Sequence, residues 1–281
     1  MRLSEHNQIA SSSEVEHVAF VTEAAAGQTV LIEFPEPIKR RAVLVRSSPA
    51  SSHPQPVPAN ELLILSVPAP VEEDPNLLAW VRDWVGAATP DNDHKSQMIA
   101  FQGAQIFWAP GCIALVTHPD RRAAVRKALI EFAYYENELR AIERDLGFLW
   151  PDLEAHAPLA FEFDEKSVRK RQQLSKRFQQ ILAIRARLAR ITPHVLCPHL
   201  HPPTLASQVG ERLRERTRLT HRLEFISGQL EVFERVYDLC GQRASDFMLA
   251  RTGHTLEWVI IILLLTQTIL VGVELMSTLG K

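Results

Sequence analysis

The sequence predicts an α+β protein with three parts: an N-terminal mixed α/β domain, a long antiparallel coiled-coil helical hairpin, and a single C-terminal transmembrane helix. Three observations predict this class. Short β-prone runs mix with helical patterns in the first half, an apolar stripe with heptad spacing follows, and residues 258–273 carry no charge. The expected boundaries are residues 1–15 for a disordered lead, 16–150 for the α+β domain, 164–250 for a basic helical hairpin, and 254–278 for the transmembrane tail anchor.

The N-terminal half contains seven short runs rich in β-branched and other apolar residues, separated by glycine and proline. The predicted strands are residues 17–22, 29–34, 41–46, 61–67, 98–101, 106–108 and 113–116. Apolar residues at helical spacing predict two helices, over residues 76–88 and 120–146. Strands and helices mixed over this length indicate a compact α+β or α/β sandwich.

Two long helical patterns occupy the next part of the chain. The first covers residues 165–191. The second has the cleaner stripe, in which the steps between apolar residues alternate between four and three, as in a heptad seam. Its members are Leu219, Leu223, Ile226, Leu230, Phe233, Tyr237 and Cys240. Four prolines within residues 193–203 predict a loop between the two helices, which would then form an antiparallel coiled-coil hairpin.

The C-terminal stretch, residues 256–276, is apolar on every side of a helix. At 1.5 Å per residue it would reach roughly 31 Å, about the thickness of the hydrocarbon core of a bilayer. Leu256 begins this stretch, Glu257 and Glu274 fall near its two ends, and Trp258 stands where an interfacial aromatic residue would. We therefore expect a single-pass tail anchor. The alternative is a buried C-terminal helix of a soluble domain.

Gln267 would lie near the middle of this span. A side-chain amide in hydrocarbon needs a hydrogen-bond partner, and the usual partner is another copy of the same helix. Together with the heptad seam, Gln267 predicts a homo-oligomer. A single tolerated glutamine is the alternative.

Charge is distributed unevenly along the chain. Residues 1–164 hold 13 Lys and Arg against 23 Asp and Glu, whereas residues 165–251 hold 17 against 8. Arg235, Arg243 and Arg251 precede the predicted span and Lys281 follows it, which predicts that the N-terminal bulk lies on the cytoplasmic or matrix side. The first fifteen residues lack the features of a secretory signal or transit peptide, so a bacterial inner membrane is the expected location.

Leu256-Glu257-Trp258 followed by Val-Ile-Ile-Ile-Leu-Leu-Leu resembles the C-terminal signature of the "required for meiotic nuclear division" family. The resemblance covers about residues 219–274. The family usually has an acid where this chain has Gln267, and commonly a basic residue where it has Thr255. The resemblance implies a mixed α/β domain, a helical region and one transmembrane helix. Mitochondrial relatives are linked to translation at the inner membrane, so it also implies that the protein holds a ribosome or another assembly near a membrane.

The segment of residues 194–201 is the one candidate metal site in the sequence. It contains His194, Cys197, His199 and His201, and neutral imidazole and thiolate are zinc ligands. Two alternatives remain open for it. The segment could be a solvent-facing hairpin tip, or it could be a contact surface for a partner protein.

Arginines alternate along the start of the second basic helix. They are Arg212, Arg214, Arg216, Arg218 and Arg222. One interpretation is the solvated exterior of a coiled coil. The other is a contact for phosphate, either of ribosomal RNA or of anionic lipid headgroups. No aromatic residue interleaves these arginines, so any RNA contact would be to the backbone and salt-sensitive.

The sequence contains no glycine-rich phosphate loop, no Gly-x-Ser-x-Gly elbow and no His-Glu-x-x-His motif. We therefore expect no catalysis, no cofactor and no small-molecule substrate. The predicted function is that of a membrane-anchored scaffold that holds an assembly, such as the ribosome, near a membrane. The alternatives are a structural subunit of a larger membrane complex and a metal-binding protein that uses residues 194–201.

Overall fold

The computed structural model describes residues 13–50, 58, 60–69, 74–88, 96–196 and 204–279, with Lys166 and residues 273–279 described by their backbone. The chain divides into two compact units. The first, here called the sheet unit, takes in Met1–Asp145 and Ala186–Ser227. The second, here called the helical unit, takes in Leu146–Arg185 and Gly228–Lys281. Of the predicted disordered lead, residues 1–12 lie outside the described residues, while Glu14 and Val15 belong to a strand.

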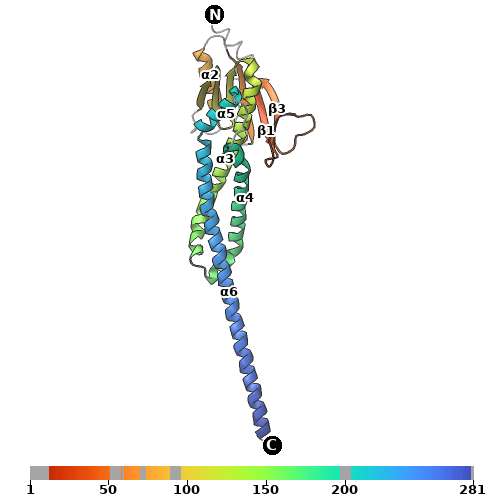
Figure 1. Ribbon diagram of the computed structural model, residues 1–281, viewed down its shortest axis with the longest axis vertical. Helices are drawn as coiled ribbons and strands as arrows, with labels where there is room; N and C mark the ends of the chain where they lie inside the picture. The colour runs from red at the N-terminus through yellow and green to blue at the C-terminus, as the bar shows by residue number, and fades with distance from the viewer. Residues whose placement is uncertain are drawn as a thin grey trace. The chain divides into compact units, whose positions relative to one another are not determined.

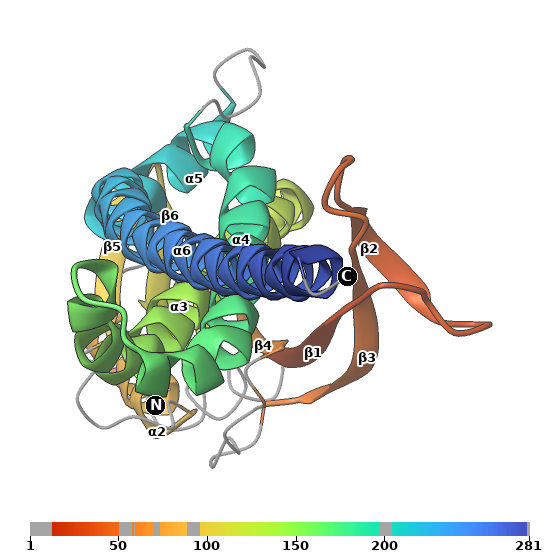
Figure 2. The ribbon, with the colours of Figure 1, turned by 90° about the horizontal axis from the view of Figure 1, so that it is seen from below.

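A seven-stranded mixed sheet forms the centre of the sheet unit (Figure 1). The strands are β1 (Glu14–Val21), β2 (Thr29–Glu33), β3 (Arg41–Pro49), β4 (Glu61–Pro68), β5 (Gln97–Phe101), β6 (Ala104–Ala109) and β7 (Cys112–Thr117). Each of the seven predicted runs corresponds to one strand. Their order is β2-β3-β1-β4-β7-β6-β5, with β4 and β7 parallel and the other neighbours antiparallel. Figure 2 shows β2 and β5 at opposite edges.

Helix α2 (Pro75–Ala88) covers one face of this sheet. Its buried side chains follow the helical spacing seen in the sequence, because Leu77, Val81 and Trp84 share one face. They pack with alternate residues of β4, Leu63 and Leu65, whose side chains point to the same side of the strand. The predicted helix over residues 76–88 is confirmed.

The N-terminal part of α3 (Pro119–His156) covers the other face. The Trp108 ring of β6 packs edge-on against Phe132, with ring centroids 5.7 Å apart. At the other end of the sheet, Phe20 and Tyr134 pack in the same manner at 5.3 Å. Both faces are therefore covered, which explains why the central strands β4 and β7 are apolar almost throughout.

Three further α-helices and two short 3-10 helices complete the described residues. They are η1 (Ala157–Ala160), η2 (Glu165–Lys170), α4 (Arg171–Leu196), α5 (Leu205–Arg216) and α6 (Leu219–Leu279). All seven residues of the predicted heptad seam are buried. The coiled-coil hairpin is not confirmed, because α5 intervenes in the chain between α4 and α6.

Two prolines lie inside helices where the sequence predicts a break. Pro151 lies within α3 and Pro193 within α4. An internal proline costs roughly 3 kcal/mol, and packing on both sides of each proline offsets that cost. Around Pro151, Trp150 packs on Phe233 at 4.9 Å and Leu153 is buried. Beyond Pro193, the next two residues also pack inside the sheet unit.

Candidate functional site

The C-terminal part of α6 exposes a long run of apolar side chains. Ile262, Leu263 and Leu264 are 60%, 63% and 58% exposed, and they are typical of residues 256–271. Within the described part of the chain, α6 is the one helix long and apolar enough to cross a membrane, and none of its most apolar 18-residue stretch is buried. In Figure 1 no other described element of the helical unit lies beside this stretch. It is compatible with a single-pass membrane anchor.

Polar side chains in this run differ in their hydrogen bonding. The hydroxyls of Thr266 and Thr268 donate to carbonyl oxygens one turn earlier, at 2.8 Å each, so the helix itself satisfies them. The Gln267 amide is exposed and has no hydrogen-bond partner among the described residues. Near the start of the run, His254 Nδ1 lies 3.2 Å from the Glu257 carboxylate. Leu256 and Trp258 are exposed, and Glu274 lies within α6.

The five arginines of the alternating run are divided between two helices. Arg212, Arg214 and Arg216 lie on α5, Arg222 lies on α6, and Arg218 lies between them with a φ of 52°. The break lies at Arg218, because its left-handed backbone conformation cannot continue a right-handed helix. The Thr217 backbone N–H and hydroxyl both donate to the Leu213 carbonyl, at 2.9 and 2.8 Å, and so cap the end of α5. The expectation of one continuous helix through this run is therefore wrong.

Arg222 belongs to a partly buried ion network in the sheet unit. Its Nε and Nη2 donate to the two carboxylate oxygens of Glu143, at 2.8 and 2.7 Å, and its Nη1 donates to Glu136 Oε1 at 3.2 Å. Arg140 Nε donates to the same Glu136 oxygen at 2.8 Å. Burial acts to lower the pKa of Arg222, but its bonds to Glu143 and the charge of Glu136 outweigh burial and raise that pKa.

A pocket of about 670 Å³, here called the arginine pocket, opens beside this network. It is lined by Ser96, Gln97, Met98, Trp108, Pro110, Arg140, Arg216, Thr217, Arg218 and Arg222. Four of these residues are arginines and none is acidic. The Arg140 guanidinium lies 6.0 Å from the centre of the Trp108 ring, within range of a cation–π contact. Gln97 Oε1 is buried, and no described residue donates a hydrogen bond to it.

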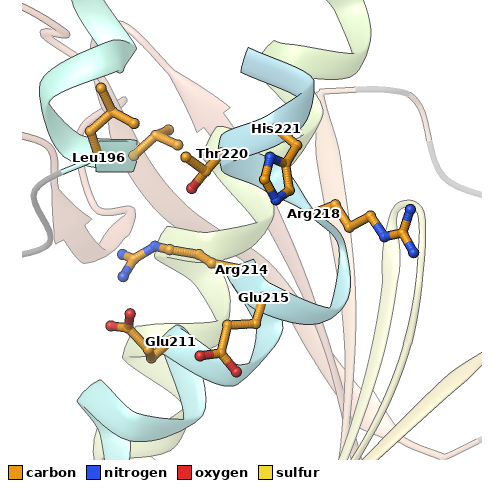
Figure 3. A pocket seen from close by; sticks show the side chains of 8 residues that line it. Leu196, Glu211, Arg214, Glu215, Arg218, Thr220 and His221 are labelled. Atoms are coloured by element: carbon orange, nitrogen blue, oxygen red, sulfur yellow. The ribbon is translucent and has the colours of Figure 1, made fainter. Parts of the chain in front are cut away.

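A second pocket of about 630 Å³, here called the mixed-charge pocket, shares Arg218 with the arginine pocket (Figure 3). Its charged lining residues are Glu211, Arg214, Glu215 and Arg218, so acidic and basic groups balance. Figure 3 shows the Arg218 side chain extending away from Arg214, which is consistent with Arg218 lining both pockets. Arg212 lines neither pocket and pairs with Glu215 at 3.0 Å on the exposed side of α5.

Of the four candidate metal ligands, His194 alone falls within the described residues. It lies on α4, with its ring stacked on Tyr135 at 5.9 Å and an angle of 10° between the planes. Cys197, His199 and His201 lie outside the described residues. In the part of the chain that is described, no three metal-ligating side chains gather at one point. The metal site stays a prediction.

Sequence reasoning missed Arg140, Glu136, Gln97 and Trp108. The spacing of Glu136 and Arg140, four residues apart on a predicted helix, is a signal for an ion pair. It does not reveal that Arg222, 86 residues beyond Glu136, joins them. For Gln97 and Trp108 the sequence carries no signal, because only strand pairing brings them opposite each other.

No model of a known protein family matches this chain, and no curated protein matches it. The resemblance to the "required for meiotic nuclear division" family therefore stays a prediction from the C-terminal residues.

Proposed function

We propose that this protein is a membrane-anchored, non-enzymatic scaffold that holds an assembly near a membrane. The exposed apolar run of α6, residues 256–271, carries this proposal. Fully burying one large aliphatic side chain is worth about 1.5–3 kcal/mol. More than ten such side chains are exposed here. In water an exposed apolar surface of this size is unfavourable and promotes aggregation. In a bilayer the same helix has the length and composition of a membrane span.

The proposed location is an inner membrane, with the N-terminal bulk on the cytoplasmic or matrix side. Arg235, Arg243 and Arg251 precede the run, and Lys281 follows it in this sequence. Positive residues near a span favour the side on which the protein is made. Arg251 is exposed on α6 close to the start of the run, where it would approach anionic headgroups, and it also pairs with the exposed Glu165 at 3.2 Å.

The proposed partners are a second copy of the chain and a ribosome. Gln267 supports the first, because its amide is exposed in the middle of the apolar run. The resemblance of Leu256-Glu257-Trp258 to the family signature supports the second. The alternative is a structural subunit of a larger membrane complex.

Vesicle flotation of the full-length chain tests the anchor. Leu263→Arg combined with Leu264→Arg places two charges in the centre of the run, at about 2.5–3.5 kcal/mol each. We expect the wild type to float with phosphatidylcholine vesicles and this variant to stay at the bottom of the gradient. Leu249→Arg is the matched control, because Leu249 is equally exposed on α6 but precedes the run. A double variant that floats like the wild type would contradict the anchor.

Co-sedimentation separates the ribosome from the membrane-complex alternative. Detergent extracts are centrifuged through sucrose at about 0.1 M and 0.5 M salt. A contact between arginines and RNA phosphate weakens steeply with salt. Ribosome co-sedimentation at low salt that is lost at high salt supports the scaffold, and salt-resistant co-purification with a fixed set of membrane proteins supports the alternative.

A further inference from the structure

We propose that the arginine pocket binds a phosphate monoester, the dianionic group carried by a free nucleotide, by a sugar phosphate or by a phosphatidic acid headgroup. The pocket brings together side chains from β5, β6, α3, α5, the α5–α6 junction and α6, all within the sheet unit. Its volume of about 670 Å³ is sufficient for a molecule of nucleotide size.

The charges of the residues around the arginine pocket favour a ligand with two negative charges. Arg140, Arg216, Arg218 and Arg222 line the pocket, and Glu136 and Glu143 contact two of these arginines. Two positive charges thus lack a carboxylate partner among the described residues, those of Arg216 and Arg218. A phosphate monoester carries about −1.5 to −2 charge at pH 7, with a second pKa near 6. A phosphodiester carries one negative charge and would leave one guanidinium uncompensated.

The buried carboxylates also hold two of the guanidinium groups in place. The side chains of Arg140 and Arg222 are only 26% and 24% exposed, and both donate to one oxygen of Glu136. Planar guanidinium groups fixed in this way are preorganised for bidentate recognition of phosphate oxygens. Arg216 and Arg218 are exposed and would close over the ligand from the solvent side.

Gln97 offers the ligand a hydrogen-bond acceptor, which an anion without a donor group cannot use. Its Oε1 is a buried acceptor in the lining and has no donor among the described residues. A buried acceptor without a donor costs about 1–3 kcal/mol. A hydroxyl of the esterified group, such as that of a ribose, would supply the missing donor. Nucleotides and sugar phosphates carry such a hydroxyl and phosphatidic acid does not, so this contact favours the soluble esters within the proposed class.

The mixed-charge pocket is similar in volume but does not fit this ligand. Glu211 and Glu215 line it together with Arg214 and Arg218. An added dianion would meet two carboxylates there. The contrast between two adjacent pockets of similar size makes charge, rather than volume, the basis of the inference.

Isothermal titration calorimetry on the full-length chain in a neutral detergent tests the proposal. The probes are inorganic phosphate, adenosine 5′-monophosphate and dihexanoyl phosphatidic acid, with adenosine 3′,5′-cyclic monophosphate as the diester. At pH 7.5 we expect at least one monoester to bind at least about ten-fold more tightly than the cyclic diester. Tighter binding of the adenosine monoester indicates a soluble ligand, and tighter binding of phosphatidic acid indicates a lipid.

The variant Arg216→Gln/Arg218→Asn removes the two unpaired charges, and asparagine tolerates the positive φ at residue 218. We expect it to weaken monoester binding by at least about ten-fold. The control Arg212→Gln/Arg243→Gln removes two exposed arginines outside the pocket and should change affinity less than about two-fold. Gln97→Leu should weaken binding of the adenosine monoester more than that of inorganic phosphate.

Two results with the wild-type chain would overturn the proposal. In the first, no monoester binds. In the second, the cyclic diester, or an RNA oligomer without a terminal phosphate, binds as tightly as the monoesters. Unchanged affinity in the folded Arg216→Gln/Arg218→Asn variant would also overturn it. Equal losses for both probes in Gln97→Leu would contradict the role of Gln97. Circular dichroism checks that each variant is folded.

Discussion

Arg222 Nη1 donates a hydrogen bond of 3.2 Å to Glu136 Oε1, and so connects the first turn of α6 to the middle of α3. The Glu136 side chain has no exposed surface. A buried carboxylate is tolerated only where positive groups compensate its lost hydration. Arg222 and Arg140 provide that compensation, and both also line the arginine pocket. The same contact therefore serves the stability of the sheet unit and the geometry of the pocket.

Replacing Arg222 should destabilise the protein strongly. Arg222→Met keeps most of the side-chain volume but leaves Glu136 with Arg140 as its one described cationic partner. We expect a loss of roughly 3 kcal/mol in the free energy of unfolding, measured by urea denaturation of the full-length chain in detergent. Arg212→Met is the matched control, because its pair with Glu215 is exposed, and it should change stability by less than about 0.5 kcal/mol. Equal effects of the two substitutions would contradict the network.

Replacing Arg218 should stabilise the protein. Its φ of 52° lies in the left-handed region, which costs an L-residue roughly 1–2 kcal/mol and glycine almost nothing. We expect Arg218→Gly to raise the free energy of unfolding by about 0.5–1 kcal/mol. Arg216→Gly removes the same charge from the last residue of α5 and should lower it by up to about 1 kcal/mol. A change of the same sign in both variants would show that charge, not backbone conformation, decides the effect.

A histidine in the helical unit should make stability pH-dependent. His156 is 4% exposed, and its Nδ1 lies 3.3 Å from the Tyr237 hydroxyl. Burial lowers the pKa of His156, with Asp152 opposing this effect and Lys170 and Arg177 adding to it. The unfolded chain then binds a proton at a higher pH than the folded chain. Stability is therefore retained above the ordinary histidine pKa, near 6.5, and falls as the pH drops below it.

Urea denaturation between pH 7.5 and 5 measures the slope of the free energy of unfolding against pH. For one histidine this slope reaches at most about 1.4 kcal/mol per pH unit. His156→Gln should flatten it. Burial also lowers the pKa of His17, so part of the slope should persist in that variant and fall further when His17→Gln is added. His221→Gln, at an exposed position, is the control and should leave the slope unchanged. A slope equally steep in the His156 variant would refute this assignment.

Removing the amide within the span should weaken self-association. Gln267→Leu eliminates the exposed amide, and couplings of this kind run about 0.6–2 kcal/mol. We expect the dimer dissociation constant in detergent to rise roughly three- to thirty-fold. Thr266→Val is the matched control, because the Thr266 hydroxyl is already satisfied by the Ile262 carbonyl. Chemical cross-linking over a detergent dilution series measures the change, and identical ladders for wild type and Gln267→Leu would rule out this contact.

Local patterns predicted the strands and α2 because their signals are contained in a few neighbouring residues. The end of α3 was not predictable in the same way. Pro151 signals a break, yet the helix runs to His156 because Trp150, Leu153 and His156 pack inside the helical unit. Tertiary packing offsets a local cost there, and residue spacing contains no information about that packing.

The candidate site shows the same limit. The alternating arginines were visible in the sequence, but their division between two helices depends on the left-handed backbone of Arg218, which the sequence does not signal. Arg140 and Gln97 come to the pocket from α3 and β5, which lie far from α5 in the chain. Charge spacing alone could not distinguish Arg212, which pairs on the surface, from Arg222, which enters a buried network.

The central claim is that the apolar run of α6 lies in a lipid bilayer. Alkaline carbonate extraction of membranes from cells that express the full-length chain tests it most directly, because carbonate removes peripheral proteins and leaves spanning helices in place. We predict that the wild-type chain stays in the membrane pellet, and that Leu263→Arg/Leu264→Arg moves it to the supernatant. Release of the wild-type chain by carbonate would contradict the account.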